Sequence, residues 1–523
     1  MSRFVDAVDG FGVTRPTTIA FENSRGERIS YGELRSASDA LALLLCEADP
    51  AYRPVVVYGH KSPLMIACFL ACAKSGRAYV PVDIVYPDLR VIDILDQLGA
   101  PIVLNTTTRD LTPLAAHAGR IVSLKELECC RTEKASEPSA SFQAVSGDDT
   151  FYILFTSGST GRPKGVEVTA ECVDNFWAWM TDEFAEDGHS ANTPRVLFNR
   201  APFSFDLSLT DIALGLGAGD TMFALAEEDE DNLARGFEAL GRAGIDFWCS
   251  TASFADMCLR DPSFSRELLP RVKTFFFVGE TLKNATAAKL LERFDGCEVI
   301  NGYGPTESTD LVTSVSITRE MCERNEPLPV GRPMPGCELH ILDPDTLAPL
   351  PRGEQGELFI VGDTVAKGYF GRADLTQAVF ASCPPSIAGN RRSYRTGDAA
   401  FLDESGMLHF RGRLDFQIKL HGFRIELGEI ESALRRLDDI EDACVLPIER
   451  RGAISHLSAC VVANTPAADE SETANDFERA LAVKEHLRES LPEYMVPRNI
   501  VFLPELPLNA NGKVDRKRLQ ELV

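Results

Sequence analysis

One segment carries most of the chemistry in this chain: residues 156–165 read Thr156-Ser157-Gly158-Ser159-Thr160-Gly161-Arg162-Pro163-Lys164-Gly165. It follows the apolar run Phe151-Tyr152-Ile153-Leu154-Phe155, which is typical of a buried strand, so we expect a loop at a strand end. Glycines let the backbone approach a polyanion, hydroxyls and amides can donate to phosphate, and Lys164 adds a positive charge. The Walker spacing is absent, because Lys164 lies between Pro163 and Gly165. The segment predicts a nucleotide triphosphate site, although a run rich in serine and glycine is by itself also typical of a surface loop.

Length and composition indicate a soluble protein of more than one domain. The 523 residues exceed one ordinary domain, and the shares of 44% hydrophobic and 25% charged residues are those of globular proteins. The formal net charge of -25 argues against binding to nucleic acid or to an anionic membrane, since either normally needs a basic face. No apolar run approaches the ~20 residues of a membrane span, and the N-terminus opens no secretory signal pattern. We therefore expect a cytoplasmic protein.

The apolar pattern predicts the fold class. Helical patterns alternate with short runs rich in Val, Ile and Phe, such as residues 54–58, 275–278 and 358–361. That alternation is typical of an α/β fold with layered, mostly parallel sheets. Residues 411–415 indicate a boundary, because a short helix from about Glu426, a strand near residues 443–445 and a basic tail follow them. We expect a large N-terminal domain of residues 1–413 and a small, mobile α+β lid domain of residues 414–523.

Four further polar motifs follow the glycine-rich loop. The first motif, residues 301–307, comes after an apolar run that ends at Ile300. We expect it to form a Gly-Tyr-Gly turn that presents a ring to a purine and a carboxylate to Mg²⁺. The second motif, residues 394–398, places a carboxylate after a glycine turn, which suits the two ribose hydroxyls. Any one motif could be a tight turn or a solvated loop. They are Asn301-Gly302-Tyr303-Gly304-Pro305-Thr306-Glu307, Tyr394-Arg395-Thr396-Gly397-Asp398, residues 412–426, and Asn509-Ala510-Asn511-Gly512-Lys513-Val514-Asp515-Arg516.

With all five motifs in this order, the chain resembles the adenylate-forming superfamily of acyl-CoA synthetases, luciferases and peptide-synthetase adenylation domains over essentially its whole length. Residues 201–208 and 411–422 resemble most closely the D-alanine:D-alanyl carrier protein ligases. The resemblance implies an acid–thiol ligase with two steps in one site. ATP and a carboxylic acid give an acyl-adenylate and pyrophosphate, and a phosphopantetheine thiol then displaces AMP. We expect such catalysis to depend on positioning and charge neutralisation rather than on a protein nucleophile.

The resemblance also implies roles for single residues. Lys513 would be the catalytic residue, between the substrate carboxylate and the α-phosphate, and Glu307 would ligate Mg²⁺. Asp415 would be the hinge about which the lid swings, so that Lys513 withdraws and Gly422 lines a pantetheine tunnel. The implied ATP-binding residues are Thr156, Ser157, Gly158, Ser159, Thr160, Lys164, Asn301, Tyr303, Gly304, Thr306, Asp398 and Arg413. Among them, Tyr303 would stack on adenine near Asn301, while Asp398 and Arg413 would hold the ribose region.

The substrate is expected to be a small amino acid. Asp206 matches the family's aspartate that pairs with an α-ammonium group, and such a charge-assisted contact disfavours fatty and aryl acids. Alignment with the family gives the other pocket positions as Leu207, Thr210, Cys249, Phe276, Val278, Gly302, Asp310 and Leu311, of which Leu207 and Phe276 limit the volume. The D-alanine ligases typically carry a cysteine at Val278 and a small or apolar residue at Asp310. D-alanine is our first prediction, and a diamino acid, a β-amino acid, glycine and serine are the alternatives.

The expected partner is a separate, phosphopantetheinylated carrier protein, because Val523 follows the last motif closely. We expect a monomer, since one chain supplies every motif. The sequence disfavours two other classes of protein. An acyl-CoA or aryl-CoA ligase is disfavoured by Asp206, and a binding protein without activity is disfavoured because Lys164, Glu307, Asp398 and Lys513 are all present.

Overall fold

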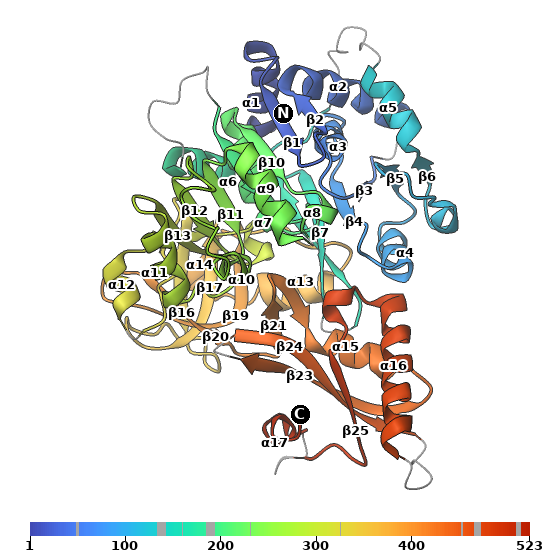
Figure 1. Ribbon diagram of the computed structural model, residues 1–523, viewed down its shortest axis with the longest axis vertical. Helices are drawn as coiled ribbons and strands as arrows, with labels where there is room; N and C mark the ends of the chain where they lie inside the picture. Colours follow the sequence, from blue (N-terminus) through green and yellow to red (C-terminus); the bar gives the residue numbers. More distant parts are fainter. Residues whose placement is uncertain are drawn as a thin grey trace. The chain divides into compact units, whose positions relative to one another are not determined.

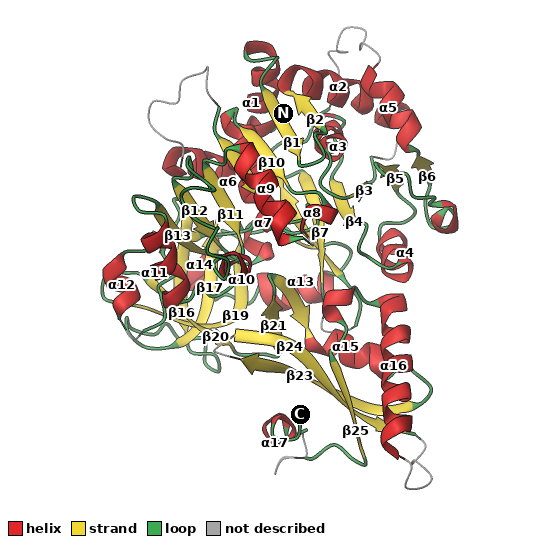
Figure 2. Cartoon of the chain, in the orientation of Figure 1, coloured by secondary structure: helices red, strands yellow, loops and turns green. Residues whose placement is uncertain are grey.

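The computed structural model describes residues 1–48, 52–132, 143–158, 161–184, 194–230, 232–324, 326–450, 453–464, 472–508 and 514–523. These residues form two compact units. The first contains residues 1–83, 98–154 and 165–414, and the second contains residues 84–97, 155–164 and 415–523. Helices alternate with strands along most of the chain, as Figures 1 and 2 show. The predicted α/β fold is confirmed, whereas the motion of residues 414–523 as a lid stays a prediction.

The largest sheet has nine strands in the order β15-β14-β13-β12-β11-β9-β10-β1-β2. The strands from β13 to β1 pair in parallel, and β2, β14 and β15 add antiparallel edges. Because both faces of its centre are covered, the central strands are continuous apolar runs. The strands are β1 (Ile19–Asn23), β2 (Arg28–Ser30), β9 (Val196–Asn199), β10 (Thr221–Ala224), β11 (Phe247–Ser250), β12 (Thr274–Phe277), β13 (Glu298–Tyr303), β14 (Thr313–Ser316) and β15 (Arg332–Pro333).

A second sheet has seven strands in the order β18-β8-β7-β4-β3-β5-β6. Strand β3 pairs in parallel with both β4 and β5. The helix that follows β3, α3 (Pro63–Lys74), begins at Ser62, whose hydroxyl accepts a hydrogen bond from the Met65 amide, and every residue of this helix is buried. The strands are β3 (Val55–Gly59), β4 (Tyr79–Asp83), β5 (Ile102–Asn105), β6 (Arg120–Val122), β7 (Thr150–Thr156), β8 (Lys164–Thr169) and β18 (Gly368–Tyr369).

The third sheet is wholly antiparallel and consists of β16 (Cys337–Leu342), β17 (Gly356–Gly362), β19 (Ser393–Leu402) and β20 (Leu408–Arg413). The predicted glycine turn before Asp398 is wrong, because residues 394–398 lie within β19. The register of β19 against β17 shifts opposite Leu358, and Gly397 has a φ of 73°. A bulge therefore replaces the turn, and glycine supplies the left-handed backbone that it needs.

Helices cover the sheets of the first unit. Helix α1 packs against α2 and α6, and its start is fixed by Asp174, which accepts hydrogen bonds from the Ser2 hydroxyl and the Phe4 amide. The helices are α1 (Arg3–Thr14), α2 (Tyr31–Ala48), α5 (Leu124–Thr132), α6 (Ala170–Phe184), α7 (Leu207–Asp211), α8 (Glu227–Glu230), α9 (Leu233–Ala243), α10 (Ala252–Cys258), α11 (Asn284–Arg293), α12 (Arg319–Glu323), α13 (Ala373–Phe380) and α14 (Pro385–Ala388).

The second unit contains a three-stranded sheet with a different apolar cluster on each face. Ala443 and Val445 pack with α15 and α16, whereas Cys444 and Leu446 pack with Leu519 of α17. This alternation follows from the period of two along a strand. The elements are α4 (Asp88–Gln97), β21 (Gln417–Leu420), β22 (Phe423–Glu426), α15 (Leu427–Leu434), β23 (Ile440–Arg450), β24 (Ala453–Ala463), α16 (Glu472–Ser490), β25 (Asn499–Leu503) and α17 (Arg516–Gln520).

Candidate active site

The predicted amino-acid pocket lies where parallel strands of the nine-stranded sheet end. Asn199, Cys249 and Phe276 are direct neighbours in register on β9, β11 and β12. Neighbours in register share one face of a sheet, so their side chains point the same way. A Cβ atom at Gly302 on β13 would lie 2.9 Å from Cδ1 of Leu311 and 3.1 Å from the Thr313 carbonyl oxygen, so a side chain here would force its neighbours to shift. The structure therefore brings predicted pocket residues from separate segments to one edge of the sheet, where open α/β sheets bind ligands.

Burial of these positions is nearly complete. Leu207, Thr210, Cys249, Phe276, Val278, Asp310 and Leu311 are each at most 5% exposed. The apolar members fit ordinary core packing as well as a ligand pocket. Their assignment to the substrate therefore stays a prediction.

Asp206 precedes helix α7 and its carboxylate is held in place by two donors. Oδ1 accepts from the Leu207 amide at 2.9 Å, and Oδ2 accepts from the Thr306 hydroxyl. Thr306 is a predicted ATP-binding residue, and in this structure its hydroxyl orients the carboxylate predicted for the substrate ammonium. Each carboxylate oxygen can accept more than one hydrogen bond, so the orientation that the Leu207 amide and the Thr306 hydroxyl give to Asp206 suits contact with an ammonium group.

Asp310 lies close enough to Asp206 for the two carboxyl groups to interact electrostatically. Its Oδ2 accepts a hydrogen bond from the Thr210 hydroxyl, and the residue is 2% exposed. Burial raises the pKa of Asp310 well above its usual value, and the charge of Asp206 raises it further. Thr309 and Asp310 both have left-handed backbone, with φ of 62° and 72°. The Asp206 and Asp310 carboxylates therefore favour a state in which at most one is charged until a cation binds.

The segment predicted to turn before Tyr303 is strand instead. Strand β13 continues through Tyr303, because β14 pairs with it antiparallel and brings Thr313 opposite Tyr303. The predicted Gly-Tyr-Gly turn is therefore wrong. The chain leaves the strand only after Tyr303, and a short 3₁₀ helix, Thr306–Ser308, carries Glu307.

Tyr303, Asp398 and Arg413 form one hydrogen-bonded group. The Tyr303 hydroxyl donates to Oδ2 of Asp398, and Nη1 of Arg413 donates to Oδ1 at 2.9 Å. Arg413 also donates to the Thr396 carbonyl oxygen at 2.9 Å. Burial raises the pKa of Tyr303 well above its usual value, and the Asp398 charge adds to this, so the phenol stays a donor. The residues predicted for adenine and ribose thus meet, although they are far apart in the chain.

Asn301 offers a specific acceptor. Its Nδ2 donates to the Pro329 carbonyl oxygen at 2.8 Å, which fixes the orientation of the amide. Its Oδ1 is buried and has no hydrogen-bond partner among the described residues. An acceptor without a donor is costly in a protein interior. An amino group such as that of adenine would satisfy it.

Glu307 is fully buried and one of its oxygens is already held. The Tyr369 hydroxyl donates to Oε1 at 2.6 Å, and the Ala366 amide donates to the Glu307 backbone oxygen at 2.9 Å. Within the described ranges, no group of three or more His, Cys, Asp and Glu side chains forms a metal site. Magnesium usually binds to one or two carboxylates, with water and substrate phosphates completing its shell. A single carboxylate fits that pattern, and Tyr369 is a partner that the sequence did not single out.

The phosphate loop is described in part, in the second unit. Lys164, predicted to lie in the loop, is the first residue of strand β8. The Ser157 hydroxyl donates to the Arg424 carbonyl oxygen at 2.7 Å, and the Gly158 amide donates to Oε2 of Glu429 at 3.2 Å. Oε1 of Glu429 accepts from Arg90 at 2.8 Å. Ser157 and Gly158, which are predicted to donate hydrogen bonds to phosphate, therefore donate to oxygen atoms of the protein in this structure, and one of these belongs to a carboxylate. Ser159, Thr160 and Lys513 lie outside the described residues.

The local backbone conformation explains the hairpin that carries Gly422. Residues 421 and 422 join β21 to β22, and their φ angles are 53° and 86°. Two successive left-handed residues are typical of a tight two-residue hairpin turn, and glycine suits its second position. The roles predicted for Gly422 in a pantetheine tunnel and for Asp415 as a hinge stay predictions.

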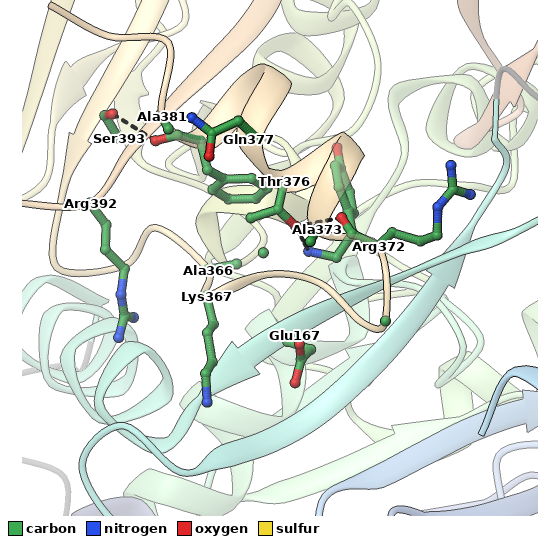
Figure 3. Close-up of a pocket in the computed structure, with 14 residues that line it drawn as sticks. Glu167, Ala366, Lys367, Arg372, Ala373, Thr376, Gln377, Ala381, Arg392 and Ser393 are labelled. Atoms are coloured by element: carbon green, nitrogen blue, oxygen red, sulfur yellow. Dashed lines mark hydrogen bonds between the residues drawn. The ribbon is translucent and has the colours of Figure 1, made fainter. Parts of the chain in front are cut away.

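A cavity of about 680 Å³ lies elsewhere in the first unit, between β8, β18 and α13. Figure 3 shows Lys367, Arg392 and Glu167 projecting toward the same side of it. None of the predicted site residues that the structure describes lines this cavity. Tyr369 is its link to the predicted site, because Tyr369 lines the cavity and also donates to Glu307.

Comparison with known families decides the classification. The model of the AMP-binding enzyme family matches residues 11–370, and the AMP-binding enzyme C-terminal domain matches residues 429–513. The chain belongs to the AMP-binding enzyme family. The predicted resemblance is thereby confirmed, and ATP is supported as the nucleotide. In the described part of this family member, no helix has the length and apolar character to cross a membrane.

Curated relatives match over the full length. The protein named "D-alanine--D-alanyl carrier protein ligase" of Bacillus cereus (strain G9842) is 42% identical over 523 residues, and the match covers 99% of each chain. The protein of the same name from Bacillus mycoides (strain KBAB4) is 41% identical over 522 residues, again with 99% of each chain covered. The closer resemblance predicted from the motifs is confirmed.

Solved structures share the fold. Holo-PA1221, described as an NRPS protein containing adenylation and PCP domains, matches with a TM-score of 0.79 at 26% identity, over 99% of this chain and 84% of that chain. The o-succinylbenzoate CoA synthetase (MenE) of Bacillus subtilis matches with a TM-score of 0.80 at 20% identity, over 100% and 98% of the two chains. The second likeness shows the fold alone.

Proposed function

We propose that this protein is an amino acid:carrier protein ligase that uses ATP to activate a small amino acid. D-alanine is the leading candidate for that substrate. The aminoacyl group then passes from AMP to the phosphopantetheine thiol of a separate carrier protein. The observation that supports this most strongly is the full-length identity of 42% to a relative named for that substrate and partner. The carboxylate of Asp206, held by the Leu207 amide and the Thr306 hydroxyl, gives the substrate ammonium a fixed acceptor.

The first step is proposed to use six residues of the first unit. Asp206 pairs with the ammonium, Oδ1 of Asn301 accepts from the adenine amino group, and Asp398 accepts from ribose hydroxyls while Arg413 and Tyr303 hold it. Glu307 would hold Mg²⁺, which would supply neutralising charge to the phosphates. Because these groups are fixed before substrate arrives, little reorganisation is needed when charge develops.

Three parts of the proposal rest on the family resemblance alone. Lys513 neutralises the substrate carboxylate and the α-phosphate, Asp415 is the hinge, and Ser159 and Thr160 take part in phosphate binding. We also propose that the enzyme works as a cytoplasmic monomer. The second step breaks the mixed anhydride between the acyl group and AMP and forms a thioester, with AMP as the leaving group.

The test is amino-acid-dependent ATP–pyrophosphate exchange, followed by mass spectrometry of a holo-carrier protein. Exchange with D-alanine and a carrier heavier by one alanyl residue support the proposal. Formation of an acyl-coenzyme A with a fatty or aryl acid, without exchange with amino acids, would instead indicate an acyl-CoA ligase. Asp206→Asn is the matched variant, because it keeps the shape of the side chain and removes the charge that selects an amino acid.

A further inference from the structure

Three buried or half-buried aspartates lie close together around Thr210. Asp206 precedes helix α7 and Asp211 is its last residue, and both raise the pKa of Asp310 through their charges. Burial raises the pKa of Asp211 to about 8, although hydrogen bonds from Asn199 and Cys249 oppose the shift. Because carboxylates this close repel one another, binding of a positively charged group between them is strongly favoured.

A buried tyrosine hydroxyl belongs to the same group. Tyr152 on β7 is 1% exposed, and its hydroxyl has no hydrogen-bond partner among the described residues. Burial raises its pKa well above the usual value, and the charges of Asp206 and Asp310 contribute to the increase. The hydroxyl therefore lies within electrostatic reach of both carboxylates. An unpartnered hydroxyl in a protein interior indicates a missing ligand group, because polar groups there are normally satisfied.

The polar atoms of this group are mostly acceptors. Oδ1 of Asp211 and Oδ1 of Asn199 are also buried and have no hydrogen-bond partner in the described ranges. The basic residue Lys61 lowers the pKa of Asp211 but is itself engaged, because its ammonium pairs with Glu230 and donates to the Arg200 carbonyl oxygen. Among the described residues, the hydrogen-bond donors to the Asp310 carboxylate are the hydroxyl and the backbone of Thr210, and both are uncharged.

The balance of donors and acceptors selects the ligand chemistry. The α-ammonium group assigned to Asp206 adds one positive charge and leaves Asp310 with neutral donors from Thr210. A methyl side chain would leave the remaining acceptors unsatisfied, and a hydroxyl would add one donor without charge. A second ammonium group adds three donors and one charge. Acceptor-rich surroundings with three carboxylates favour this last group most.

We infer that Asp310, Thr210 and Tyr152 form a subsite for a second ammonium group of the substrate. The enzyme therefore activates a small diamino acid with amines on neighbouring carbons in addition to D-alanine. It activates the diamino acid more efficiently than D-alanine. The inference rests on the proposed amino-acid activation. It makes Asp310 a specificity-determining residue that contacts the substrate side chain.

The left-handed backbone at Asp310 guides the choice of variant. Aspartate and asparagine tolerate a φ of 72° better than β-branched residues do, so Asp310→Asn removes the charge without adding backbone strain. Tyr152→Phe removes only the unpartnered hydroxyl and is a second, independent variant. Glu354→Gln, at an exposed carboxylate outside the site, is the matched control.

The test is ATP–pyrophosphate exchange with D-alanine, D- and L-2,3-diaminopropionate and D-serine. We expect kcat/KM for 2,3-diaminopropionate to exceed that for D-alanine by about tenfold, the ratio that one charge-assisted hydrogen bond supplies. Asp310→Asn should lower this ratio by about tenfold or more, and Tyr152→Phe by about threefold. Glu354→Gln should leave it unchanged.

The outcomes separate this inference from the proposed function. Exchange with D-alanine that exceeds exchange with 2,3-diaminopropionate would overturn the inference and leave the proposed function standing. A ratio that is the same in the wild type and in both site variants would also overturn it. Absence of exchange with every amino acid would contradict the proposed function itself, and with it the inference.

Discussion

The Tyr303 hydroxyl donates a hydrogen bond to Oδ2 of Asp398 and so joins a strand of the nine-stranded sheet to a strand of the antiparallel sheet. Arg413 donates to the other oxygen of the same carboxylate at 2.9 Å. Asp398 is therefore oriented by a neutral donor on one oxygen and a charged donor on the other. This relationship positions the carboxylate that we assign to the ribose hydroxyls.

We expect Tyr303→Phe to raise KM for ATP by about fivefold, because one neutral hydrogen bond is worth about 1 kcal/mol. The value of kcat should change less, since Arg413 still holds Asp398. Steady-state kinetics at saturating amino acid measure both constants. A fall in kcat with an unchanged KM would argue against a role for this pair in nucleotide binding.

The second prediction concerns magnesium. Glu307→Gln should raise the Mg²⁺ concentration needed for half-maximal exchange by about tenfold or more, because a neutral amide is a weaker ligand for a hard cation. Removal of Mg²⁺ with EDTA should abolish exchange, and added Mg²⁺ should restore it. The control is Glu354→Gln, which should leave the Mg²⁺ requirement as it is in the wild type. Full activity in EDTA would contradict the assignment of Glu307.

The third prediction is a pH effect on stability. Asp211 has a pKa raised from 3.8 to about 8, so the folded state binds a proton that the unfolded state releases between these values. Its contribution to stability is fully present below pH 3.8 and is lost as pH rises toward about 8. Within that window the loss is at most about 1.4 kcal/mol per pH unit.

Asp211→Asn should therefore unfold with a weaker dependence on pH than the wild type between pH 5 and pH 8. Denaturant unfolding at several pH values gives the two slopes. Equal slopes for the two proteins would show that Asp211 titrates normally in the folded state.

The fourth prediction concerns a structural ion pair away from the site. Nε of Arg195 lies 2.8 Å from Oδ2 of Asp220, and their side chains are 4% and 2% exposed. Asp220→Ala should lower the free energy of unfolding by about 3 to 5 kcal/mol, because it leaves a buried guanidinium without its partner. Asp295→Ala is the control, since the Asp295 side chain in its pair with Arg319 is 90% exposed and such pairs contribute little. Thermal unfolding of the two variants should show a large shift for the first and almost none for the second.

Much of the fold could be predicted from apolar runs. The predicted strand at residues 54–58 is β3, the one at residues 275–278 is β12, and the helix from about Glu426 is α15. The direction of pairing could not be predicted everywhere. Strand β17 is buried along its whole length, as parallel strands usually are, yet both of its neighbours are antiparallel.

The sequence predicted which residues belong to the site, but it did not predict the contacts between them. Short-range signals marked Tyr303 and Asp398, because each is next to glycine, and Glu307, which lies two residues after Pro305. The hydrogen bonds from Thr306 to Asp206 and from Tyr369 to Glu307 join segments distant in sequence, and no local pattern encodes such pairs. The turns predicted near Tyr303 and Asp398 were wrong for a related reason, since β14 and β17 extend the ladders through both segments.

The central claim is that this chain activates an amino acid with ATP, and ATP–pyrophosphate exchange tests it most directly. We expect exchange that requires D-alanine or a small diamino acid, falls by about 10- to 100-fold in Asp206→Asn through loss of a charged hydrogen bond, and is lost in Lys513→Ala. Exchange that proceeds with a fatty or aryl acid, and is the same in the wild type and in Asp206→Asn, would contradict the account.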